Sequence, residues 1–392
     1  MIQSEATLLA ITIALVEFVH GALLVVLLPT MLTQRLGWAM GTTGAAVSTY
    51  FFTEVALKLL AGWLVDRIGT RTLLLWGFWL YLAAYTVLVL SRTTWQVFIM
   101  LATMGAAASP LWPAALTRLT RGGPGCAGGV LGRLFSIWFL GGGVGIGLAT
   151  LISRASHPVP LAVFTLPLLL AALLGLGIRP EVFTRRAPAA RPEVRGVIGL
   201  MLRSLAQLAT SLIPQIIAAG ILIPIIVPYL EDIRGLDERQ LFLLLLLGPG
   251  TALALMEPAG RMGDRFGRQR TYAVALGAVA LLLITLPLCR SLWALTLDVV
   301  GIGVGYAFVL PAWNSILLHL LPADVRGAGL GVAMTIEGMG GVVGPVVGGL
   351  LWQWSNPSSP FYLSGGLLLL AAGASMWWRR AAVEGEAVEV ER

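Results

Sequence analysis

Long apolar segments separated by short polar connections dominate the chain, and they predict helices rather than strands. The stretch from Leu73 to Leu90, for example, contains no charged residue. A helix needs about 20 mostly apolar residues to cross a bilayer, whereas a membrane-spanning strand alternates in polarity over about ten residues. The pattern therefore predicts an all-α membrane protein with twelve spans. Their expected ranges are 7–33, 41–65, 73–90, 94–117, 128–152, 160–178, 208–230, 240–260, 271–289, 293–320, 327–352 and 360–378.

One long polar connection interrupts this series between the sixth and seventh spans. It runs from Arg179 to Arg203 and carries six arginines and three prolines. The connection divides the chain into two groups of six helices. We expect an N-terminal bundle at 1–178, a cytoplasmic linker at 179–207, a C-terminal bundle at 208–379 and a cytoplasmic tail at 380–392.

Composition and charge agree with a membrane location. Of the 392 residues, 57% are hydrophobic and only 11% are charged, against about 25% charged in soluble domains. With both termini placed in the cytoplasm, nineteen of the 26 basic residues fall in inside segments and six in outside loops, as the positive-inside rule requires. The arginines therefore report topology, and no nucleic-acid partner is expected. We expect both termini to lie on the cytoplasmic side of the membrane.

Enzymatic and ATP-driven functions are disfavoured by the residues present. The two cysteines, Cys126 and Cys289, have no metal-ligand spacing, and the three histidines are scattered. No phosphate-binding Gly-x4-Gly-Lys-Ser/Thr motif and no nucleophile–base pattern occurs in the sequence. We therefore expect no enzyme, no metal and no cofactor.

An internal repeat relates the two halves. Residues 62–69 (Gly-Trp-Leu-Val-Asp-Arg-Ile-Gly) and 260–267 (Gly-Arg-Met-Gly-Asp-Arg-Phe-Gly) share four residues at an offset of 198. Further Gly and Pro pairs keep offsets of 198 or 199 through the corresponding helices. A duplicated six-helix unit is the architecture of many secondary transporters, whose site lies near the bilayer midplane.

The first copy, Gly-x-Leu-x-Asp-Arg-x-Gly-x-Arg, resembles the signature of the major facilitator superfamily. The resemblance implies two pseudo-symmetric six-helix bundles. It also implies that the Asp and Arg brace cytoplasmic helix ends during alternating access. The residues expected to form this gating motif are Gly62, Asp66, Arg67, Gly69 and Arg71 in the first copy, and Gly260, Asp264, Arg265 and Gly267 in the second.

Ionisable residues inside the apolar spans mark the candidate site, because burial in a membrane costs several kcal/mol unless partners or water are present. Glu17 and His20 are spaced i,i+3 in the first span, and Glu54 and Lys58 are spaced i,i+4 in the second, so each pair shares a helix face. We interpret them as the lining of a polar, titratable cavity in the N-terminal half. A structural ion pair is an equally open interpretation for Lys58. Carboxyls in low dielectric can titrate near neutral pH.

Tryptophans and glycines within the spans complete the candidate residues. Trp112, Trp138 and Trp313 lie inside spans and are candidate cavity aromatics, with ordinary helix packing as the alternative. Trp95, Trp293, Trp352 and Trp354 fit interfacial anchors. The eleventh span has a glycine-proline pattern that permits close helix contact and bending. Its expected packing residues are Gly340, Gly344, Pro345, Gly348 and Gly349.

Several of these residues together resemble the lipoteichoic-acid glycolipid flippases, which are proton-coupled antiporters. The resemblance covers Glu17-Phe18-x-x-Gly21, Glu54, Ser109-Pro110-x-Trp112, Trp138, residues 310–314 and Gly344-Pro345-x-x-Gly348-Gly349. It implies that Glu17, Trp112 and Trp138 line a polar N-terminal pocket. His20 stands where that family has Arg, and Glu54 where it has Asp.

With this resemblance, we expect a proton-coupled translocase of a lipid or glycolipid, working as a monomer in the bacterial cytoplasmic membrane with a proton gradient as the energy source. Its expected proton-coupling and head-group residues are Glu17, His20, Glu54 and Lys58. The head group would face the N-terminal half, and the acyl chains would follow an apolar C-terminal half past Ile221. A proton-coupled exporter of drugs or other amphipathic small molecules is the alternative. It is disfavoured because Leu101 and Ile146 replace the Arg and Pro that drug antiporters carry. A sugar or metabolite transporter is the second alternative.

Overall fold

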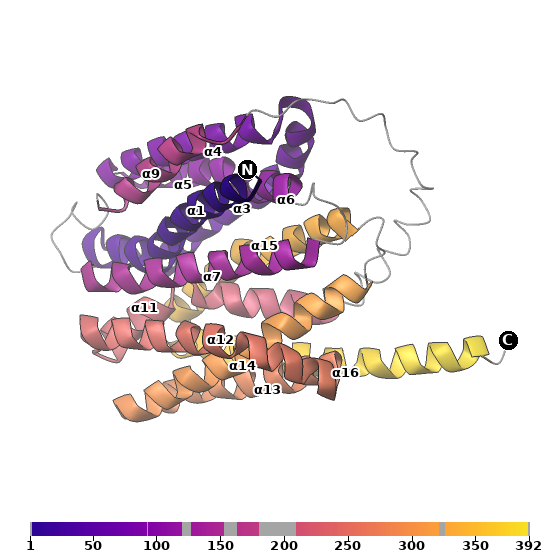
Figure 1. Ribbon diagram of the computed structural model, residues 1–392. Helices are drawn as coiled ribbons and strands as arrows, with labels where there is room; N and C mark the ends of the chain where they lie inside the picture. The colour runs from indigo at the N-terminus through magenta and orange to yellow at the C-terminus, as the bar shows by residue number, and fades with distance from the viewer. Residues whose placement is uncertain are drawn as a thin grey trace. The chain divides into compact units, whose positions relative to one another are not determined.

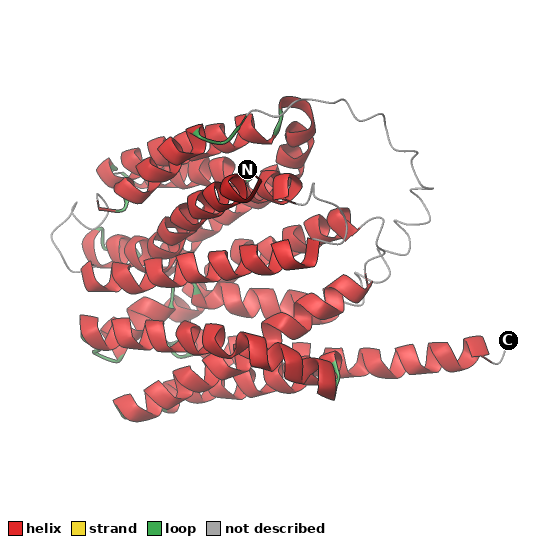
Figure 2. Cartoon of the chain, in the orientation of Figure 1, coloured by secondary structure: helices red, strands yellow, loops and turns green. Residues whose placement is uncertain are grey.

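The computed structural model describes residues 2–91, 93–119, 127–152, 163–179, 209–320 and 326–390, and these residues form helices and short connections without a strand (Figure 2). The first half contains α1 (Ile2–Gly21), η1 (Ala22–Leu27), α2 (Leu28–Thr30), η2 (Met31–Arg35), α3 (Met40–Ile68), α4 (Thr70–Leu90), α5 (Thr94–Ala108), α6 (Leu111–Leu119), α7 (Ala127–Ile152) and α9 (Thr165–Leu176) (Figure 1).

The second half begins with a helix over Ala209–Leu222. It continues with α11 (Ile226–Pro228), η5 (Tyr229–Ile233), α12 (Glu238–Phe266), α13 (Arg268–Thr285), η6 (Leu286–Leu288), α14 (Leu292–Leu320), α15 (Arg326–Trp354) and α16 (Ser359–Val390). The prediction of a cytoplasmic tail at 380–392 thus falls largely within α16. The linker at 179–207 lies almost entirely outside the described residues.

Each of the twelve predicted spans corresponds to helix in the described part of the chain, so the predicted fold class is confirmed. Eight helical stretches are long and apolar enough to cross a membrane. A ninth consists of Ala209–Leu222 and Ile226–Ile233, which meet at an angle of 53°. Pro224 stands at this bend, where a ring without an N–H interrupts helical hydrogen bonding. The remaining three are α3, which carries Glu54 and Lys58, α7 and the shorter α9.

Contacts divide the chain into two compact units. Unit 1 contains Met1–Thr184, Ile221–Leu246 and Gly341–Pro357, and unit 2 contains Arg185–Gly220, Leu247–Gly340 and Ser358–Arg392. Unit 1 therefore contains parts of α12 and α15 besides the N-terminal helices. The N-terminal bundle at 1–178 and the C-terminal bundle at 208–379 remain a division made on the sequence.

Four glycines show that the internal repeat extends to backbone conformation. Gly37 and Gly235 both have φ of +66°, while Gly69 and Gly267 have φ of +88° and +90°. Both pairs are separated by 198 positions, the same offset as the motif. Positive φ is readily adopted only by glycine because other residues have a Cβ. The same two turns are therefore built into each half.

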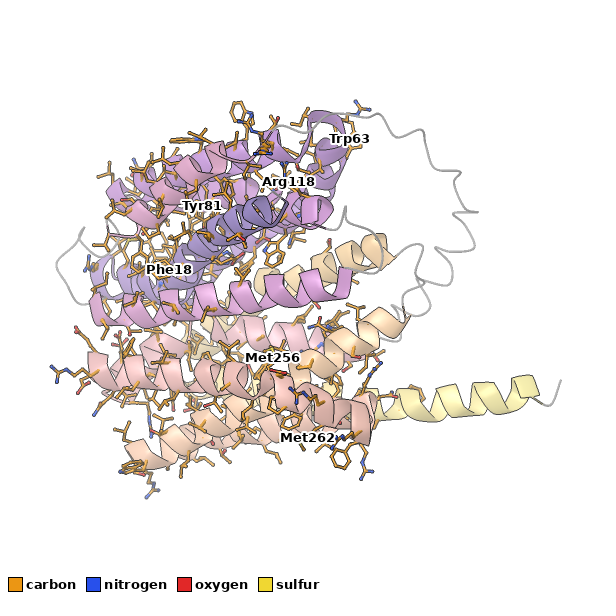
Figure 3. All side chains as sticks on the ribbon, in the orientation of Figure 1. Phe18, Trp63, Tyr81, Arg118, Met256 and Met262 are labelled. Carbon is orange, nitrogen blue, oxygen red and sulfur yellow. The ribbon has the colours of Figure 1, made fainter. Side chains whose placement is uncertain are left out.

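Side-chain burial fits a protein that spans a bilayer. Tyr50, Tyr81 and Tyr272 are fully buried among helices, and Tyr81 lies in the interior of unit 1 (Figure 3). Many large apolar side chains are exposed instead, as lipid contact allows. Trp95 and Trp293 are 78% and 80% exposed at the first turn of α5 and α14, as expected of interfacial anchors.

Candidate functional site

Glycines set the position of α1, the helix that carries Glu17 and His20. A Cβ added to Gly145 of α7 would overlap the backbone oxygen of Phe18, and one on Gly141 would lie 2.8 Å from the oxygen of Ala14. Gly21 of α1 meets α7 in the same way. The backbones of α1 and α7 are therefore in direct contact beside Glu17. Small residues permit this close approach.

A second glycine contact sets the position of α3. A Cβ on Gly105 of α5 would overlap the backbone oxygen of Tyr50 and lie 3.1 Å from the backbone nitrogen of Glu54. The backbone of α3 at Tyr50 and Glu54 is therefore in close contact with α5. Lys58 follows one turn later, and its Nζ lies 2.9 Å from Oε1 of Glu54.

The polar side chains of α1, α3 and α6 meet within unit 1. The indole N–H of Trp112 donates to Oε1 of Glu17 at 3.0 Å. His20 Nδ1 lies 3.8 Å from Oε2 of the same carboxylate and 3.2 Å from the hydroxyl of Tyr50. The Tyr50 ring also meets the His20 ring edge-on, with centroids 5.0 Å apart. Three helices therefore bring an indole, a carboxylate, an imidazole and a phenol into one polar cluster, with one hydrogen bond at Glu17 and another between His20 and Tyr50.

Burial determines what this cluster can bind. Glu17 and Glu54 are 6% and 8% exposed, so both carboxyl groups are largely removed from water. His20 is only partly buried, and its ring can donate or accept depending on which nitrogen carries the proton. A buried carboxylate within reach of an imidazole and an indole N–H can bind a proton, a hydroxyl group or a cation.

The sequence identified Glu17, His20, Glu54, Lys58 and Trp112 but missed Tyr50. Tyrosine is common in apolar spans, so the residue type alone did not distinguish Tyr50 from the other tyrosines of the chain. Its position four residues before Glu54 was the available signal, because residues at i and i+4 share a helix face. Trp138 lies in α7, but its side chain is outside the described residues.

Trp313 meets a different glutamate, in unit 2. Its indole N–H donates to Oε1 of Glu337 on α15 at 3.0 Å. The ring of Tyr272 packs on Trp313 with centroids 5.8 Å apart. The Tyr272 hydroxyl donates to Oε1 of Gln215 and lies 3.2 Å from the hydroxyl of Ser211. The expectation of an apolar C-terminal half is therefore incomplete, because four helices bring polar groups together here.

The two gating-motif copies share a turn, and their first glycines have different surroundings. Gly69 and Gly267 adopt the positive φ noted above, while a Cβ on Gly62 would meet nothing within 4 Å. A Cβ on Gly260 would meet only Pro311, at 3.5 Å. The Arg265 side chain is exposed. The side chains of Asp66 and Asp264 lie outside the described residues, so their bracing role remains a prediction.

Arginines of unit 1 hold the end of α9. Arg71 donates from Nε to the carbonyl oxygen of Ile178 at 2.5 Å, and Arg118 donates to that of Arg179 at 2.7 Å and to Thr70 Oγ1 at 3.1 Å. Cations are favourable at a helix C-terminus, where carbonyls lack partners.

The first-copy motif also includes a cation–π contact. The Arg67 guanidinium lies 4.0 Å from the ring centroid of Trp63. Trp63 and Arg118 are labelled in Figure 3. From the sequence alone, Arg118 is one of the arginines that report topology, and nothing local predicts its contacts with Thr70 and Arg179.

The glycine-proline pattern of α15 forms close contacts at successive turns. In unit 2, a Cβ on Gly340 would overlap the carbonyl group of Ile216. In unit 1, Gly348 meets the backbone oxygen of Ile221, and Gly349 meets that of Met40. Pro345 contributes as well, since its carbonyl oxygen lies against Gly44 of α3.

The position of Ile221 corrects one expectation. Its side chain is fully buried and its backbone contacts Gly348. A charge there would therefore disturb helix packing, and Ile221 does not line an open acyl path. Gly344, the other residue of the pattern, lies in the same helix directly before Pro345.

Comparisons with known proteins agree with this architecture. The sequence profile of the Major Facilitator Superfamily matches residues 9–213 and again 208–391, one match for each half. The proton-coupled antiporter flippase LtaA of Staphylococcus aureus (strain USA300) is 25% identical over 371 residues, which cover 92% of this chain and 91% of the relative. The corresponding protein of strain N315 is 24% identical over the same length.

Solved structures show the same fold at low sequence identity. A D-xylose-proton symporter superimposes with a TM-score of 0.77 and 14% identity, covering 96% of this chain and 97% of the other. The human organic anion transporter MFSD10 (TETRAN) gives 0.73 and 16% identity, with coverage of 95% and 99%. With two profile matches spanning nearly the whole sequence, the chain belongs to the Major Facilitator Superfamily of membrane transporters.

Proposed function

We propose that the protein is a proton-coupled secondary transporter that flips a lipid or glycolipid across the bacterial cytoplasmic membrane by alternating access. The observation that carries the proposal is the buried cluster of unit 1, in which Trp112 and His20 converge on the Glu17 carboxylate. The relatives named proton-coupled antiporter flippases are similar over nine-tenths of the chain, which supports the same class of reaction.

Proton and head group would share the Glu17 carboxylate. The ionised carboxylate accepts hydrogen bonds, whereas the protonated form loses its charge and turns one oxygen into a donor. A head-group hydroxyl bound to ionised Glu17 would therefore be released when a proton arrives. Antiport requires this competition, because substrate and proton must occupy the site in different states. The His20 ring, 3.2 Å from the Tyr50 hydroxyl, supplies a second group that can pass the proton on.

The Glu54–Lys58 pair would keep the site close to neutral. At 2.9 Å the two side chains form an ion pair within one helix, so neither charge is isolated in the membrane. This geometry favours a neutralising role for Lys58. Glu54 would then become available to a substrate or proton only when Lys58 moves away.

The remaining features follow from the family. We propose that Asp66 and Arg67, with Asp264 and Arg265, brace helix ends on the cytoplasmic side, where both termini would lie. The proton gradient would supply the energy without a cofactor, and the protein would work as a monomer. Hydrogen bonds of Arg71 and Arg118 support the bracing of helix ends, since they tie α9 to α4 and α6 at one end of unit 1.

The test uses the full chain reconstituted into liposomes with an imposed pH gradient. Movement of a fluorescent diacylglycerol glycolipid, a phospholipid and a cationic drug is compared. We expect the glycolipid to move, and we expect Glu17→Gln to abolish the dependence of its movement on the gradient. Glutamine still offers Trp112 an acceptor oxygen, so folding should be retained.

A matched control separates this effect from a general loss of charge. Glu257→Gln removes an exposed carboxylate of α12 that pairs with Arg261, and it should leave transport unchanged. Coupling of wild-type strength in Glu17→Gln would contradict the assignment of the proton site. Movement of the drug without the glycolipid would favour the amphipath exporter instead.

A sugar or metabolite transporter is the second candidate, and the polar network of unit 2 favours it. Trp313, Glu337, Tyr272 and Gln215 offer a small polar solute hydrogen-bonding groups that acyl chains do not need. Uptake of radiolabelled sugars into the same liposomes distinguishes the two candidates. Gradient-driven sugar uptake without glycolipid movement would decide for the solute transporter.

A further inference from the structure

We propose that unit 2 contains a second proton-binding site, the carboxyl group of Glu337 held by Trp313. This inference rests on the proposed proton coupling, but it concerns a residue that the coupling cluster of unit 1 does not include. The geometry that points to it is the hydrogen bond of 3.0 Å from the Trp313 indole N–H to Oε1 of Glu337. The same donor type and distance occur at Glu17 and Trp112.

The location of Glu337 suits proton exchange. It lies near the middle of the long α15, eleven residues after Arg326, so it falls within the membrane-spanning part of the chain. Ionisable residues at such depth are functional by default, since their burial is costly. The side chain is partly exposed, whereas Trp313 is only 3% exposed. The carboxyl group is therefore open to a proton while its partner is fixed inside the fold.

The partner is held rigidly by a chain of neutral groups. Trp313 packs on Tyr272, whose hydroxyl bonds to Gln215 and approaches Ser211. Ser211 in turn donates to the backbone oxygen of Ala371 at 2.9 Å. These contacts fix the indole, so its N–H stays aimed at Glu337 in either protonation state. A rigid donor beside a carboxyl group stabilises the ionised form, while the surrounding apolar membrane segments favour the neutral form.

The packing of the neighbouring helices fixes α15 at this level. Gly340, one turn beyond Glu337, brings the α15 backbone against Ile216 of the helix Ala209–Leu222. Gln215 immediately precedes Ile216, so the backbone contact and the polar network coincide. The carboxyl group is thus attached to a helix whose backbone cannot shift without breaking this contact. Protonation of Glu337 would alter a bond at the point where these two helices are locked together.

The other titratable groups around the site define the controls. On α13, Tyr272 interacts electrostatically with Glu337 and with Tyr306 of α14, while Arg268 and Arg270 lie at the start of the helix. The helix Ala209–Leu222 has no titratable residue. On α14, Asp298 bonds to Thr285, and the His319 side chain is outside the described residues. On α3, which contacts α15 at Gly341, the charged residues are Glu54 and Lys58, with Asp66 and Arg67 in its last turn.

The experiment observes the Trp313 indole directly. The full-length protein is labelled with 5-fluorotryptophan, placed in lipid nanodiscs and titrated by ¹⁹F NMR, with the Trp313 signal assigned through Trp313→Phe. We expect this signal to shift with pH in one step, because loss of the negative charge on Glu337 weakens the indole hydrogen bond. In Glu337→Gln the step should be lost, since the amide oxygen accepts the same bond at every pH.

Three variants keep the result interpretable. Glu54→Gln and Glu257→Gln should both retain the Trp313 step, which excludes the charged pair of α3 and the exposed pair of α12 as its source. Glu337→Asp should retain a step displaced along the pH axis, and it supplies a carboxyl-bearing variant should Glu337→Gln fail to fold. A Trp313 signal independent of pH, or a step that survives in Glu337→Gln, would overturn the proposal. Because no substrate or gradient is used, failure of lipid flipping leaves this result unaffected.

Discussion

The Glu17–Trp112 pair of unit 1 and the Glu337–Trp313 pair of unit 2 have the same hydrogen bond, at 3.0 Å, in different electrical surroundings. In unit 1 the polar residues nearby include a histidine and the Glu54–Lys58 ion pair. In unit 2 the tryptophan packs on Tyr272, whose hydroxyl group is hydrogen-bonded to Gln215 and Ser211, and all three residues are neutral. The same type of bond therefore occurs in both units, with charged groups close to it in unit 1 and neutral groups behind it in unit 2.

This difference has an energetic consequence. A buried charge that loses its partner costs several kcal/mol, whereas a neutral group that loses one hydrogen bond costs about 1–3 kcal/mol. Unit 1 should therefore be the more sensitive half to single substitutions and to pH. Unit 2 should tolerate the loss of individual polar groups better. The following predictions test this contrast.

The largest effect is expected from Lys58→Met. The substitution leaves Glu54, which is 8% exposed, without the ammonium group 2.9 Å away. Breaking a buried pair in this way costs about 3–5 kcal/mol. Tyr272→Phe in unit 2 should cost only about 1–2 kcal/mol, because it removes one hydroxyl group. Resistance to unfolding by SDS, measured on both variants, gives the comparison.

The double variant Lys58→Met with Glu54→Gln is the matched control. It removes both charges, so it should recover most of the stability lost in the single variant. Equal stability of Lys58→Met and Tyr272→Phe would show that the ion pair contributes little. The contrast between the units would then have no electrostatic basis.

A smaller effect is expected at the glycines that hold the two sites. Ala at Gly145 would collide with the backbone of Phe18 in unit 1, and Ala at Gly340 with that of Ile216 in unit 2. Each substitution should cost about 2–3 kcal/mol through overpacking. Because these contacts are steric, they should not differ between the units. Thermal unfolding followed by tryptophan fluorescence measures both.

Gly366→Ala provides the reference for these glycine variants. Gly366 lies within α16 and has no atom within 4 Å of its virtual Cβ. Alanine favours a helix interior over glycine by about 1 kcal/mol, so this variant should be slightly stabilised. Destabilisation of Gly366→Ala equal to that of Gly145→Ala would contradict the close-contact explanation.

The smallest effect is expected from Trp112→Phe and Trp313→Phe. Each retains an aromatic ring and loses one N–H donor to a carboxylate, which should cost about 1–2 kcal/mol. The stability against unfolding should fall by the same amount in both variants, whereas the pH dependence of transport should change by different amounts. We expect Trp112→Phe to change the pH dependence of flipping more strongly, since Glu17 is also linked to His20. An identical pH profile in both variants would remove the proposed specialisation of unit 1.

Local sequence rules predicted the short-range parts of the candidate site correctly. The i,i+3 spacing of Glu17 and His20 and the i,i+4 spacing of Glu54 and Lys58 imply shared helix faces, and the structure has an ion pair at 2.9 Å for the second. The pairing of Trp313 with Glu337 was not predicted. The two residues lie on different helices, and no local spacing relates them.

What the sequence by itself determined is the set of spans, the repeat and its turns. A bilayer demands long apolar helices, and only glycine readily adopts the positive φ found at Gly69 and Gly267. Only the tertiary structure decided which tryptophan meets which glutamate. Glu17 and Trp112 are 95 residues apart, and their contact depends on how glycines let α1, α7, α3 and α5 approach. Helix rotation and depth arise from packing among many side chains at once, so they cannot be read from any single segment.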